Sequence, residues 1–208
     1  MTYTTIAGTS TSDEIIVGGS SGTDSVTALG GNDTITGGGS VDILSLGDGN
    51  DLVTKSAAYT GGKIEGGAGN DTFYTVNKLN SSTVDLGAAN DSISVSGTDK
   101  SVSATTLSGG LGADTIYFAA TSDEVVSTTV YGGASDVTST DGSDSISAQG
   151  NLKTSFIQGN AGSDTVFLNA KSTTDTVRGG AAADSIRVGG IVSGSWLSGD
   201  RGSDTISL

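Results

Sequence analysis

The stretch GGAGNDTFY at residues 66–74 decides the fold class, because it recurs along the chain. A second copy, GGLGADTIY, occupies residues 109–117, and looser copies begin at Gly159 and Gly199. Each copy places a glycine-rich turn before an aspartate and an apolar residue two positions after it. Glycine accommodates turns with positive φ, and the polar–apolar alternation that follows is typical of a half-buried strand. The sequence therefore predicts a repeated unit of turn and strand.

Aspartates followed two positions later by an apolar residue mark this unit along the whole chain. We call them the ladder aspartates: Asp13, Asp33, Asp51, Asp71, Asp91, Asp114, Asp144, Asp164, Asp184 and Asp204, spaced by 20, 18, 20, 20, 23, 30, 20, 20 and 20 residues. The apolar residues that follow are Ile15, Ile35, Val53, Phe73, Ile93, Ile116, Ile146, Val166, Ile186 and Ile206. Seven positions before each ladder aspartate lie Ile6, Val26, Leu44, Ile64, Val84, Leu107, Val137, Ile157, Val177 and Leu197. Every unit thus carries two apolar anchors with a turn between them.

A unit of about 20 residues has room for two short strands and two turns, but not for a helix as well. The sequence predicts an all-β fold, a parallel β-solenoid (β-roll) of about ten coils stacked at about 4.8 Å. No coil can bury its apolar face alone, so stacking creates the core. We expect one domain over residues 1–208, with the longest unit forming a loop within 119–136 that contains Ser122–Glu124 and Tyr131–Gly133.

The composition excludes several classes of function. The chain has no His and no Cys, which rules out Ser-His-Asp and Cys-His catalysis and conventional zinc sites. A net charge of −14 argues against binding to nucleic acid or to an anionic membrane, and no apolar run is long enough for membrane insertion. We do not expect an enzyme, because the segment 119–136 holds no Arg or Lys that could act as a basic catalyst.

The ladder aspartates are candidate ligands of a metal ion. Parallel stacking would place them in a file at intervals of about 4.8 Å, where two bare carboxylates repel by roughly 0.9 kcal/mol even in water. Calcium accepts about six to eight oxygens in loose geometry, which suits turn carbonyls together with shared carboxylates. The alternative is that each aspartate caps its turn through its own backbone, without a metal.

We expect several Ca²⁺ ions. The candidate ligands are Asp24, Asp33, Asp42, Asp48, Asp51, Gly66, Gly69, Asp71, Asp91, Gly109, Gly112, Asp114, Asp141, Asp144, Asp164, Asp184 and Asp204.

The pattern GGxGxDxUx, in which U is apolar, resembles the nonapeptide of RTX (hemolysin-type calcium-binding) repeat proteins. Residues 66–74 and 109–117 match it completely, and in 19–54 the residues Asp24, Asp33, Asp42 and Asp51 follow at intervals of nine. The resemblance implies a β-roll in which turn carbonyls and aspartates of adjacent coils bind Ca²⁺. It also implies a secreted protein, exported by type I secretion without an N-terminal signal.

Two departures from the family pattern limit the expected sites. From about residue 55 the second turn of each unit loses its Gly-Asp signature and becomes rich in Ser, Thr and Asn, with a lysine as in Asn77-Lys78. Calcium is therefore expected along only one edge there. In two turns the inner glycine is replaced by Ala89 and Ala182, and we expect weak binding or none at these turns.

The ends of the sequence suggest self-association. Tyr3–Ile6 fits the second-strand half of a coil and Asp204–Leu208 fits the first-strand half, so two chains could complete a coil head to tail. We therefore expect an extracellular, calcium-binding structural protein that assembles into a filament, surface layer or matrix, with cell-surface components as further partners. The alternative is a calcium-dependent binding module, such as an adhesin or an ice- or carbohydrate-binding solenoid.

Overall fold

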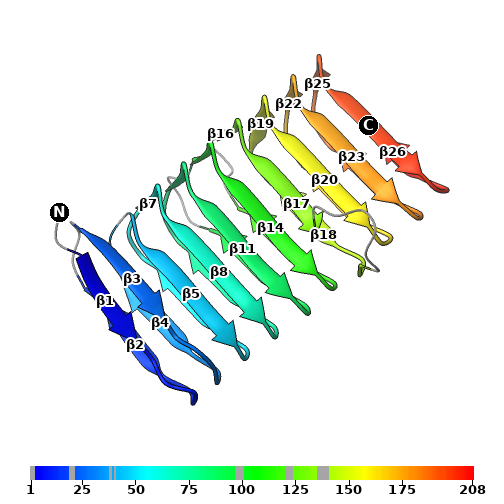
Figure 1. Ribbon diagram of the computed structural model, residues 1–208. Coiled ribbons are helices and arrows are strands. Elements are labelled where there is room, and N and C mark those ends of the chain that lie inside the picture. The colour runs from blue at the N-terminus through cyan, green and yellow to red at the C-terminus, as the bar shows by residue number, and fades with distance from the viewer. Residues whose placement is uncertain are drawn as a thin grey trace.

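The computed structural model describes residues 3–18, 22–37, 39, 41–96, 101–119, 124–134 and 141–208. These residues form a parallel β-solenoid, a rod with the N- and C-terminal coils at opposite ends (Figure 1). All strand pairs between neighbouring coils are parallel, which confirms the predicted fold class. The described residues include no helix that is long and apolar enough to cross a membrane.

Three sheets run along the rod. The first sheet has ten strands: β1 (Tyr3–Ala7), β3 (Thr23–Thr27), β5 (Ile43–Asp48), β8 (Lys63–Ala68), β11 (Thr83–Ala88), β14 (Thr106–Leu111), β17 (Thr129–Gly133), β20 (Phe156–Ala161), β23 (Thr176–Ala181) and β26 (Trp196–Arg201). The second sheet also has ten: β2 (Glu14–Val17), β4 (Thr34–Gly37), β6 (Leu52–Lys55), β9 (Thr72–Thr75), β12 (Ser92–Val95), β15 (Thr115–Phe118), β18 (Ser145–Ala148), β21 (Thr165–Leu168), β24 (Ser185–Val188) and β27 (Thr205–Ser207). The glycine-rich turn of each coil joins these two sheets.

The third sheet was not predicted, since two strands per unit had been expected. It has seven very short strands: β7 (Tyr59–Thr60), β10 (Leu79–Asn80), β13 (Val102–Ser103), β16 (Glu124–Val126), β19 (Asn151–Lys153), β22 (Ser172–Thr173) and β25 (Val192–Ser193). Its inward positions hold Tyr59, Leu79, Val102, Val125 and Leu152 in register, all of them buried. The second turn of each coil is thus a third wall of the core from residue 59 onward.

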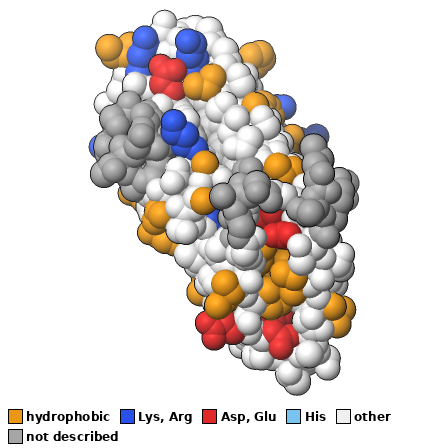
Figure 2. All heavy atoms as spheres, turned by 90° about the vertical axis from the view of Figure 1, so that its left-hand side faces the viewer, with side chains coloured by type: hydrophobic (Ala, Val, Ile, Leu, Met, Phe, Trp, Pro, Cys, Tyr) orange, Lys and Arg blue, Asp and Glu red, His pale blue; other side chains and the backbone are white. Residues whose placement is uncertain are grey.

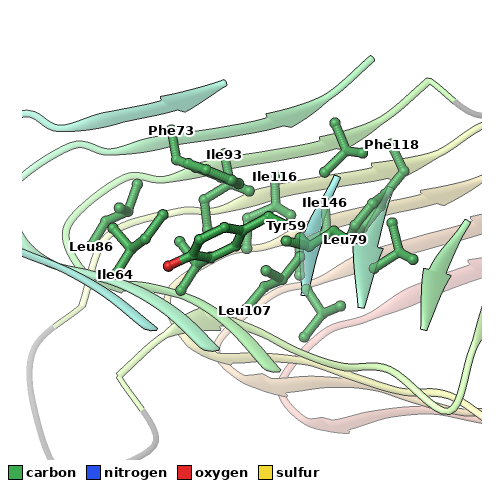
Figure 3. Packing of buried hydrophobic residues seen from close by; sticks show 14 of the residues in the cluster. Tyr59, Ile64, Phe73, Leu79, Leu86, Ile93, Leu107, Ile116, Phe118 and Ile146 are labelled. Atoms are coloured by element: carbon green, nitrogen blue, oxygen red, sulfur yellow. The ribbon is translucent and has the colours of Figure 1, made fainter. Parts of the chain in front are cut away.

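The predicted anchors form two continuous inward rows. Ile64, Val84 and Leu107 are consecutive partners in the first sheet, and Phe73 and Ile93 are partners in the second. These side chains are at most 1% exposed, and they pack with the third sheet into one core (Figure 3). The periodicity of the sequence therefore predicted the register of the long sheets correctly.

One anchor and the position of the insertion were wrong. Val130 is the partner of both Leu107 and Ile157, so it holds the position assigned to Val137, which lies outside the described residues. Glu124 and Tyr131–Gly133, expected in a loop, belong to strands β16 and β17. Val130 precedes its ladder aspartate, Asp144, by 14 residues instead of seven, so the longer part of the insertion follows Gly133 and extends past residue 136.

Candidate metal centre

The ladder aspartates lie at the start of the second-sheet strands, and they form a file of hydrogen bonds along the rod. In each step the backbone N–H of one aspartate donates to Oδ1 of the aspartate in the next coil, as from Asp71 to Asp91 at 2.6 Å and from Asp114 to Asp144 at 2.8 Å. The same bond links all ten ladder aspartates from Asp13 to Asp204. The file therefore orients every carboxylate identically.

The second oxygen of these carboxylates is buried without a hydrogen-bond partner. This holds for Oδ2 of Asp33, Asp51, Asp71, Asp91, Asp114, Asp144, Asp164 and Asp184, and also for Oδ2 of Asp141. The eight ladder residues are at most 3% exposed. Burying an unpaired carboxylate oxygen is costly, so a proton or a cation is needed at each position.

The first glycine of the turn makes room for this oxygen. A Cβ on Gly159 would lie 2.5 Å from the carbonyl oxygen of Gly179 in the next coil and would collide with Asp164 Oδ2. The corresponding Cβ on Gly66 would collide with Asp71 Oδ2 and with the Leu86 carbonyl oxygen. Carboxylate and carbonyl oxygens from adjacent coils therefore crowd the same point, an arrangement that a cation would stabilise.

The same position carries a side chain in three coils. Ala28, Leu46 and Leu86 lie five residues before Asp33, Asp51 and Asp91, and all three are buried in the core. Their side chains occupy the space that glycine leaves open at residues 66, 109 and 159. The space beside Oδ2 is thus open in the coils of Asp71, Asp114, Asp144, Asp164 and Asp184, in each of which a glycine faces the unpaired oxygen.

The other recurring feature of the turn is its positive φ. Gly69 and Gly112 have φ of 115° and 128°, and a Cβ on either would collide with a carbonyl oxygen of the preceding coil. These two glycines thus allow the turns to stack closely, whereas Gly66 and Gly109 face the carboxylates. Ala89 and Ala182 keep the positive φ, at 88° and 83°, so the turns expected to be weak have the same backbone at a steric cost.

The two additional turn aspartates differ from each other. Asp141 lies in the file: its Oδ1 accepts from the Gly112 N–H at 2.9 Å, and its Oδ2 is buried without a partner. A Cβ on Gly133 would meet Oδ2 of both Asp141 and Asp144, so two carboxylates converge there. The side chain of Asp48 is exposed, and only its backbone joins the ladder.

Burial changes the protonation of the file. Desolvation raises the pKa of Asp71 to about 7 and that of Asp91 to about 8, and the charges of neighbouring ladder aspartates contribute further. Desolvation likewise raises the pKa of Asp114 to about 6, of Asp144 to about 8 and of Asp164 to about 7, with Asp141 adding to all three. Without a cation, the buried file therefore holds protons near neutral pH.

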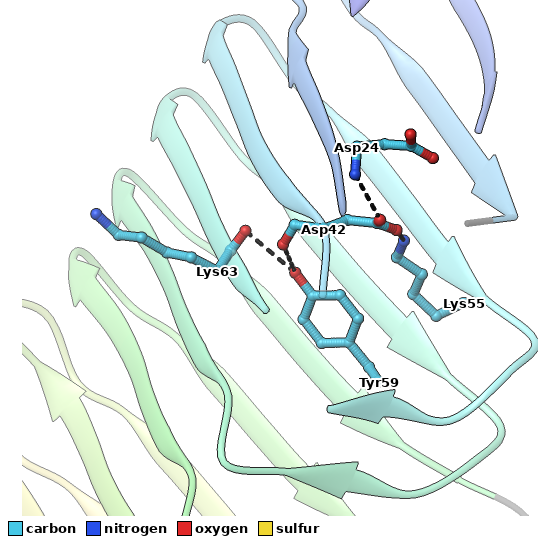
Figure 4. Close-up of polar contacts among 5 residues, drawn as sticks. All are labelled: Asp24, Asp42, Lys55, Tyr59 and Lys63. Carbon is cyan, nitrogen blue, oxygen red and sulfur yellow. Dashed lines mark hydrogen bonds and ion pairs between the residues drawn. The ribbon is translucent and has the colours of Figure 1, made fainter. Parts of the chain in front are cut away.

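The second edge of the rod, where Asp24 and Asp42 lie, differs from the file of ladder aspartates. Asp42 Oδ2 accepts a hydrogen bond from the Lys55 ammonium at 2.8 Å, and Asp42 Oδ1 accepts one from the Asp24 N–H at 3.2 Å (Figure 4). Both oxygens of the Asp42 carboxylate are therefore satisfied. Asp42 is among the metal ligands expected from the sequence, and in the structure the Lys55 ammonium lies beside its Oδ2, where a bound cation would lie.

Beyond Lys55, the second edge is built largely from hydroxyl groups. Ser155 Oγ accepts from the Thr128 N–H, and Ser195 Oγ accepts from the Asp175 N–H. The one aspartate between them, Asp175, uses both oxygens, with Oδ2 accepting from Ser172 and Thr173. These groups complete the backbone bonding without leaving a buried oxygen unpaired.

The first edge of the rod, along which the ladder aspartates lie, fits calcium by contrast. Its donors are carboxylate and carbonyl oxygens, which are the ligands Ca²⁺ prefers, and its Oδ2 atoms lack other partners. No group of three or more acidic side chains converges among the described residues, so each ion would need carbonyl oxygens as well. The sequence did not reveal these next-coil carbonyls, because any residue type can supply one.

Comparison with known proteins identifies the repeat. The family described as RTX calcium-binding nonapeptide repeat (4 copies) matches residues 18–53, 63–75, 104–125, 138–170, 149–184 and 170–190, which together make up more than half of the chain. No curated protein and no solved structure matches the chain.

The stability of the metal-free protein should fall as the pH rises. The five raised pKa values, from about 6 to about 8, lie above the ordinary aspartate value of 3.8, so the folded state binds more protons than the unfolded chain. This stabilisation is complete below pH 3.8 and is lost as the pH rises through the folded values. Thermal unfolding in EGTA should therefore show a lower Tm at pH 8 than at pH 5. A higher Tm at pH 8 would contradict the buried, unpaired file.

Replacing Asp71 by Asn should have opposite effects with and without calcium. Asn Oδ1 can still accept from the Asp51 N–H, while its Nδ2 can donate to the Leu86 carbonyl oxygen. In EGTA at pH 8, Asp71→Asn should raise the free energy of unfolding by about 1 kcal/mol, the net value of one hydrogen bond. In millimolar Ca²⁺ it should reduce the stabilisation by calcium.

The matched control is Asp48→Asn, which removes the same charge from an exposed side chain in a neighbouring turn. It should leave the free energy of unfolding in EGTA, and the stabilisation by calcium, within about 0.5 kcal/mol of the wild-type values. If Asp71→Asn destabilised the protein equally in EGTA and in Ca²⁺, the carboxylate would have a structural role unrelated to a cation.

Proposed function

Because the chain belongs to the RTX calcium-binding nonapeptide repeat family, we propose that it is an extracellular structural protein whose coils are joined by calcium. The observation that carries this proposal is the row of buried, unpartnered Oδ2 atoms along the first edge. Bound Ca²⁺ would supply the positive charge that holds a carboxylate of one coil and a carbonyl of the next together. The candidate ligands with the most open geometry are Asp71, Asp114, Asp141, Asp144, Asp164 and Asp184.

Dependence on calcium supports an extracellular location. In a compartment with little free Ca²⁺, the file at neutral pH would be partly ionised and self-repelling, which disfavours stacking. In millimolar Ca²⁺ the same carboxylates become cross-links between coils. Folding after export, in the presence of external calcium, follows from this difference, and repeats of this family are typical of secreted proteins.

We propose further that chains stack head to tail. At the C-terminal end, β26 and β27 pair only with β23 and β24 within the described chain, and at the other end β1 and β2 pair only with β3 and β4. The file also has complementary ends, because the Asp204 backbone N–H would face the Asp13 carboxylate of a second copy. Such a contact repeats without closing and produces a filament.

The distribution of charge favours this orientation. No Lys or Arg precedes Lys55, whereas five of the nine basic residues lie at position 153 or later. Figure 2 shows basic side chains mainly in the upper half of the view, with two acidic groups at the lower end. Head-to-tail stacking would bring the acidic N-terminal coils against the coils that carry most of the basic residues.

Negative-stain microscopy with an edge-blocking variant tests this proposal. The Thr205 N–H donates to the Asp184 carbonyl, so the N–H of the next residue, Ile206, points away from β24 toward the open edge. Ile206→Pro should remove an intermolecular hydrogen bond while keeping those within the chain. We expect filaments of the wild type in millimolar Ca²⁺, none in EGTA, and short rods of Ile206→Pro in Ca²⁺.

Ile206→Val keeps the outward N–H and should still form filaments. Monomeric rods of the wild type at high protein concentration in Ca²⁺ would overturn the stacking proposal but not the calcium sites. Filaments that persist in EGTA would overturn the role of calcium.

A specific surface feature favours a second candidate function, the binding of an acidic polysaccharide. A groove of about 180 Å³ on the first sheet is lined by Phe156, Thr176, Arg178 and Trp196. Phe156, Thr176 and Trp196 are partners in consecutive strands of the first sheet, and Trp196 is 69% exposed. An adjoining hollow adds Arg201 and Asp200, and the Arg178 Nε–H donates to Asp200 Oδ2 at 2.7 Å, so a ligand carboxylate would bind the remaining N–H groups of Arg178. Aromatic rings that can stack on sugars, next to guanidinium groups that can bind carboxylates, suit such a chain.

Trp196 is the only tryptophan, so its fluorescence reports directly on this groove. Titration with hyaluronan oligosaccharides in Ca²⁺ should give a saturable fluorescence change, weakened at least about tenfold by Arg178→Gln, which removes a charge-assisted bond. Arg187→Gln, on the second sheet, is the matched control and should bind normally. An unchanged fluorescence signal, or equal loss in both variants, would exclude this function.

A further inference from the structure

Lys55 is unusual because it is a cationic side chain inside the core. It ends strand β6 at an inward position, in register with Thr75 and then Val95. The Lys55 side chain is 1% exposed and that of its partner Asp42 is 0% exposed. Among the described residues it is the one buried Lys or Arg. A lysine is rarely buried in this way unless it is paired, so its position calls for a specific role.

A carboxylate and an aromatic ring surround the ammonium group of Lys55. Besides Asp42 Oδ2 at 2.8 Å, Lys55 Nζ lies 5.0 Å from the centre of the Tyr59 ring, within the range of a cation–π contact. The Tyr59 hydroxyl donates to the Asp42 carbonyl oxygen at 2.6 Å and also lies 3.1 Å from the Lys63 carbonyl oxygen (Figure 4). Burial raises the pKa of the Tyr59 phenol, which therefore remains a donor.

Local sequence choices make this cluster possible. The Tyr59 side chain fills the space where a side chain on Gly62 would lie, because a Cβ there would be 2.6 Å from ring atom Cε2 and closer still to Cζ and the hydroxyl oxygen. Gly62 occupies the position at the start of its first-sheet strand that Asp42 occupies one coil earlier. The chain thus replaces the next aspartate of the second edge by glycine and fills the space with an aromatic ring. Lys55 and Tyr59 together end the row of aspartates on this edge.

On both edges a buried aspartate oxygen needs a positive charge or a proton, but the two edges differ in what the chain provides. On the first edge the Oδ2 atoms of the ladder aspartates have no partner, whereas Asp42 Oδ2 is held by an ammonium. Asp24 and Asp42 are spaced from Asp33 and Asp51 by the same nine residues that mark the calcium-binding repeat. The positive charge at Asp42 therefore belongs to the chain itself.

We propose that Lys55 is a resident cation that replaces calcium at Asp42 on the second edge, so that the contact of β5, β6, β7 and β8 at this edge does not need the metal. On the first edge of the same coils, Oδ2 of Asp51 still lacks a partner. This inference rests on the proposed calcium binding by the first edge. It adds that one position of the calcium-binding spacing is filled by a cation that belongs to the chain itself.

Hydrogen exchange measured by mass spectrometry, in EGTA and in millimolar Ca²⁺, tests the inference on the full chain. Lys55→Met should lower the protection of 42–68 in EGTA by about a hundredfold or more, as expected when one partner of a buried ion pair is removed. Lys63→Met removes an exposed lysine paired with Glu65 in the same region and should leave protection unchanged.

Two further measurements separate a cation role from a general loss of fold. In Ca²⁺, Lys55→Met should regain protection of 42–68, and calorimetric titration should show one more bound ion than the wild type. The double variant Asp42→Asn/Lys55→Met carries no buried charge at this position and should keep protection in EGTA without the extra ion.

Several outcomes would overturn the inference. They are equal protection of residues 42–68 in Lys55→Met and Lys63→Met in EGTA, or no recovery of that protection in Lys55→Met in Ca²⁺. Wild-type protein that binds no calcium in the titration would instead refute the proposed function, while protection of 42–68 in EGTA that depends on Lys55 would still support the resident cation.

Discussion

Parallel stacking places one aspartate of every coil directly over the next, inside the rod, and most of the structure can be understood from how these carboxylates are satisfied. Oδ1 is useful to the fold, because it accepts the backbone N–H of the preceding coil and fixes the register of the turns. Oδ2 destabilises the fold, because it is buried next to a carbonyl oxygen and accepts no hydrogen bond. A solenoid of this kind needs a positive charge or a proton for each coil.

The chain uses different solutions at different places. On the first edge, glycine leaves space between the carboxylate and the next coil's carbonyl, and calcium is the proposed partner. At Asp42 the solution is Lys55, whose ammonium makes the ion pair inside the protein. Further along the second edge, Ser155 and Ser195 accept the backbone N–H with a hydroxyl and leave no charge buried. The loss of the Gly-Asp signature after residue 55 thus reflects a change in how the same backbone requirement is met.

The parts of the fold that the sequence predicted are those that repeat. The rows of Ile64 and Phe73 have a fixed distance from the ladder aspartates in nearly every coil, so their inward position and register follow from spacing alone. The third sheet could not be found in this way, because a strand such as Tyr59–Thr60 has two residues and shows no periodicity. Val130 was missed because Val137 satisfies the same spacing rule, and the length of an insertion does not say on which side of a strand it lies.

The site was predictable to the extent that it depends on aspartate and glycine. Asp42 fits the repeat in sequence but is neutralised by Lys55, 13 residues away, and only the three-dimensional structure brings these two together. Asp48 and Asp141 both lie three residues before a ladder aspartate, yet only Asp141 points an unpaired oxygen into the file. A side chain's direction within an irregular turn depends on the neighbouring coil, which local sequence does not describe.

The most direct test of the account is to locate the ions by anomalous diffraction from crystals grown in millimolar Ca²⁺. Peaks are expected along the first edge, between ladder carboxylates and the carbonyl oxygens of the next coil, clearest beside Asp71, Asp114, Asp144, Asp164 and Asp184, and none is expected beside Lys55. Crystals in which the first edge holds no ion while the Asp42 position does would contradict calcium binding by the ladder aspartates.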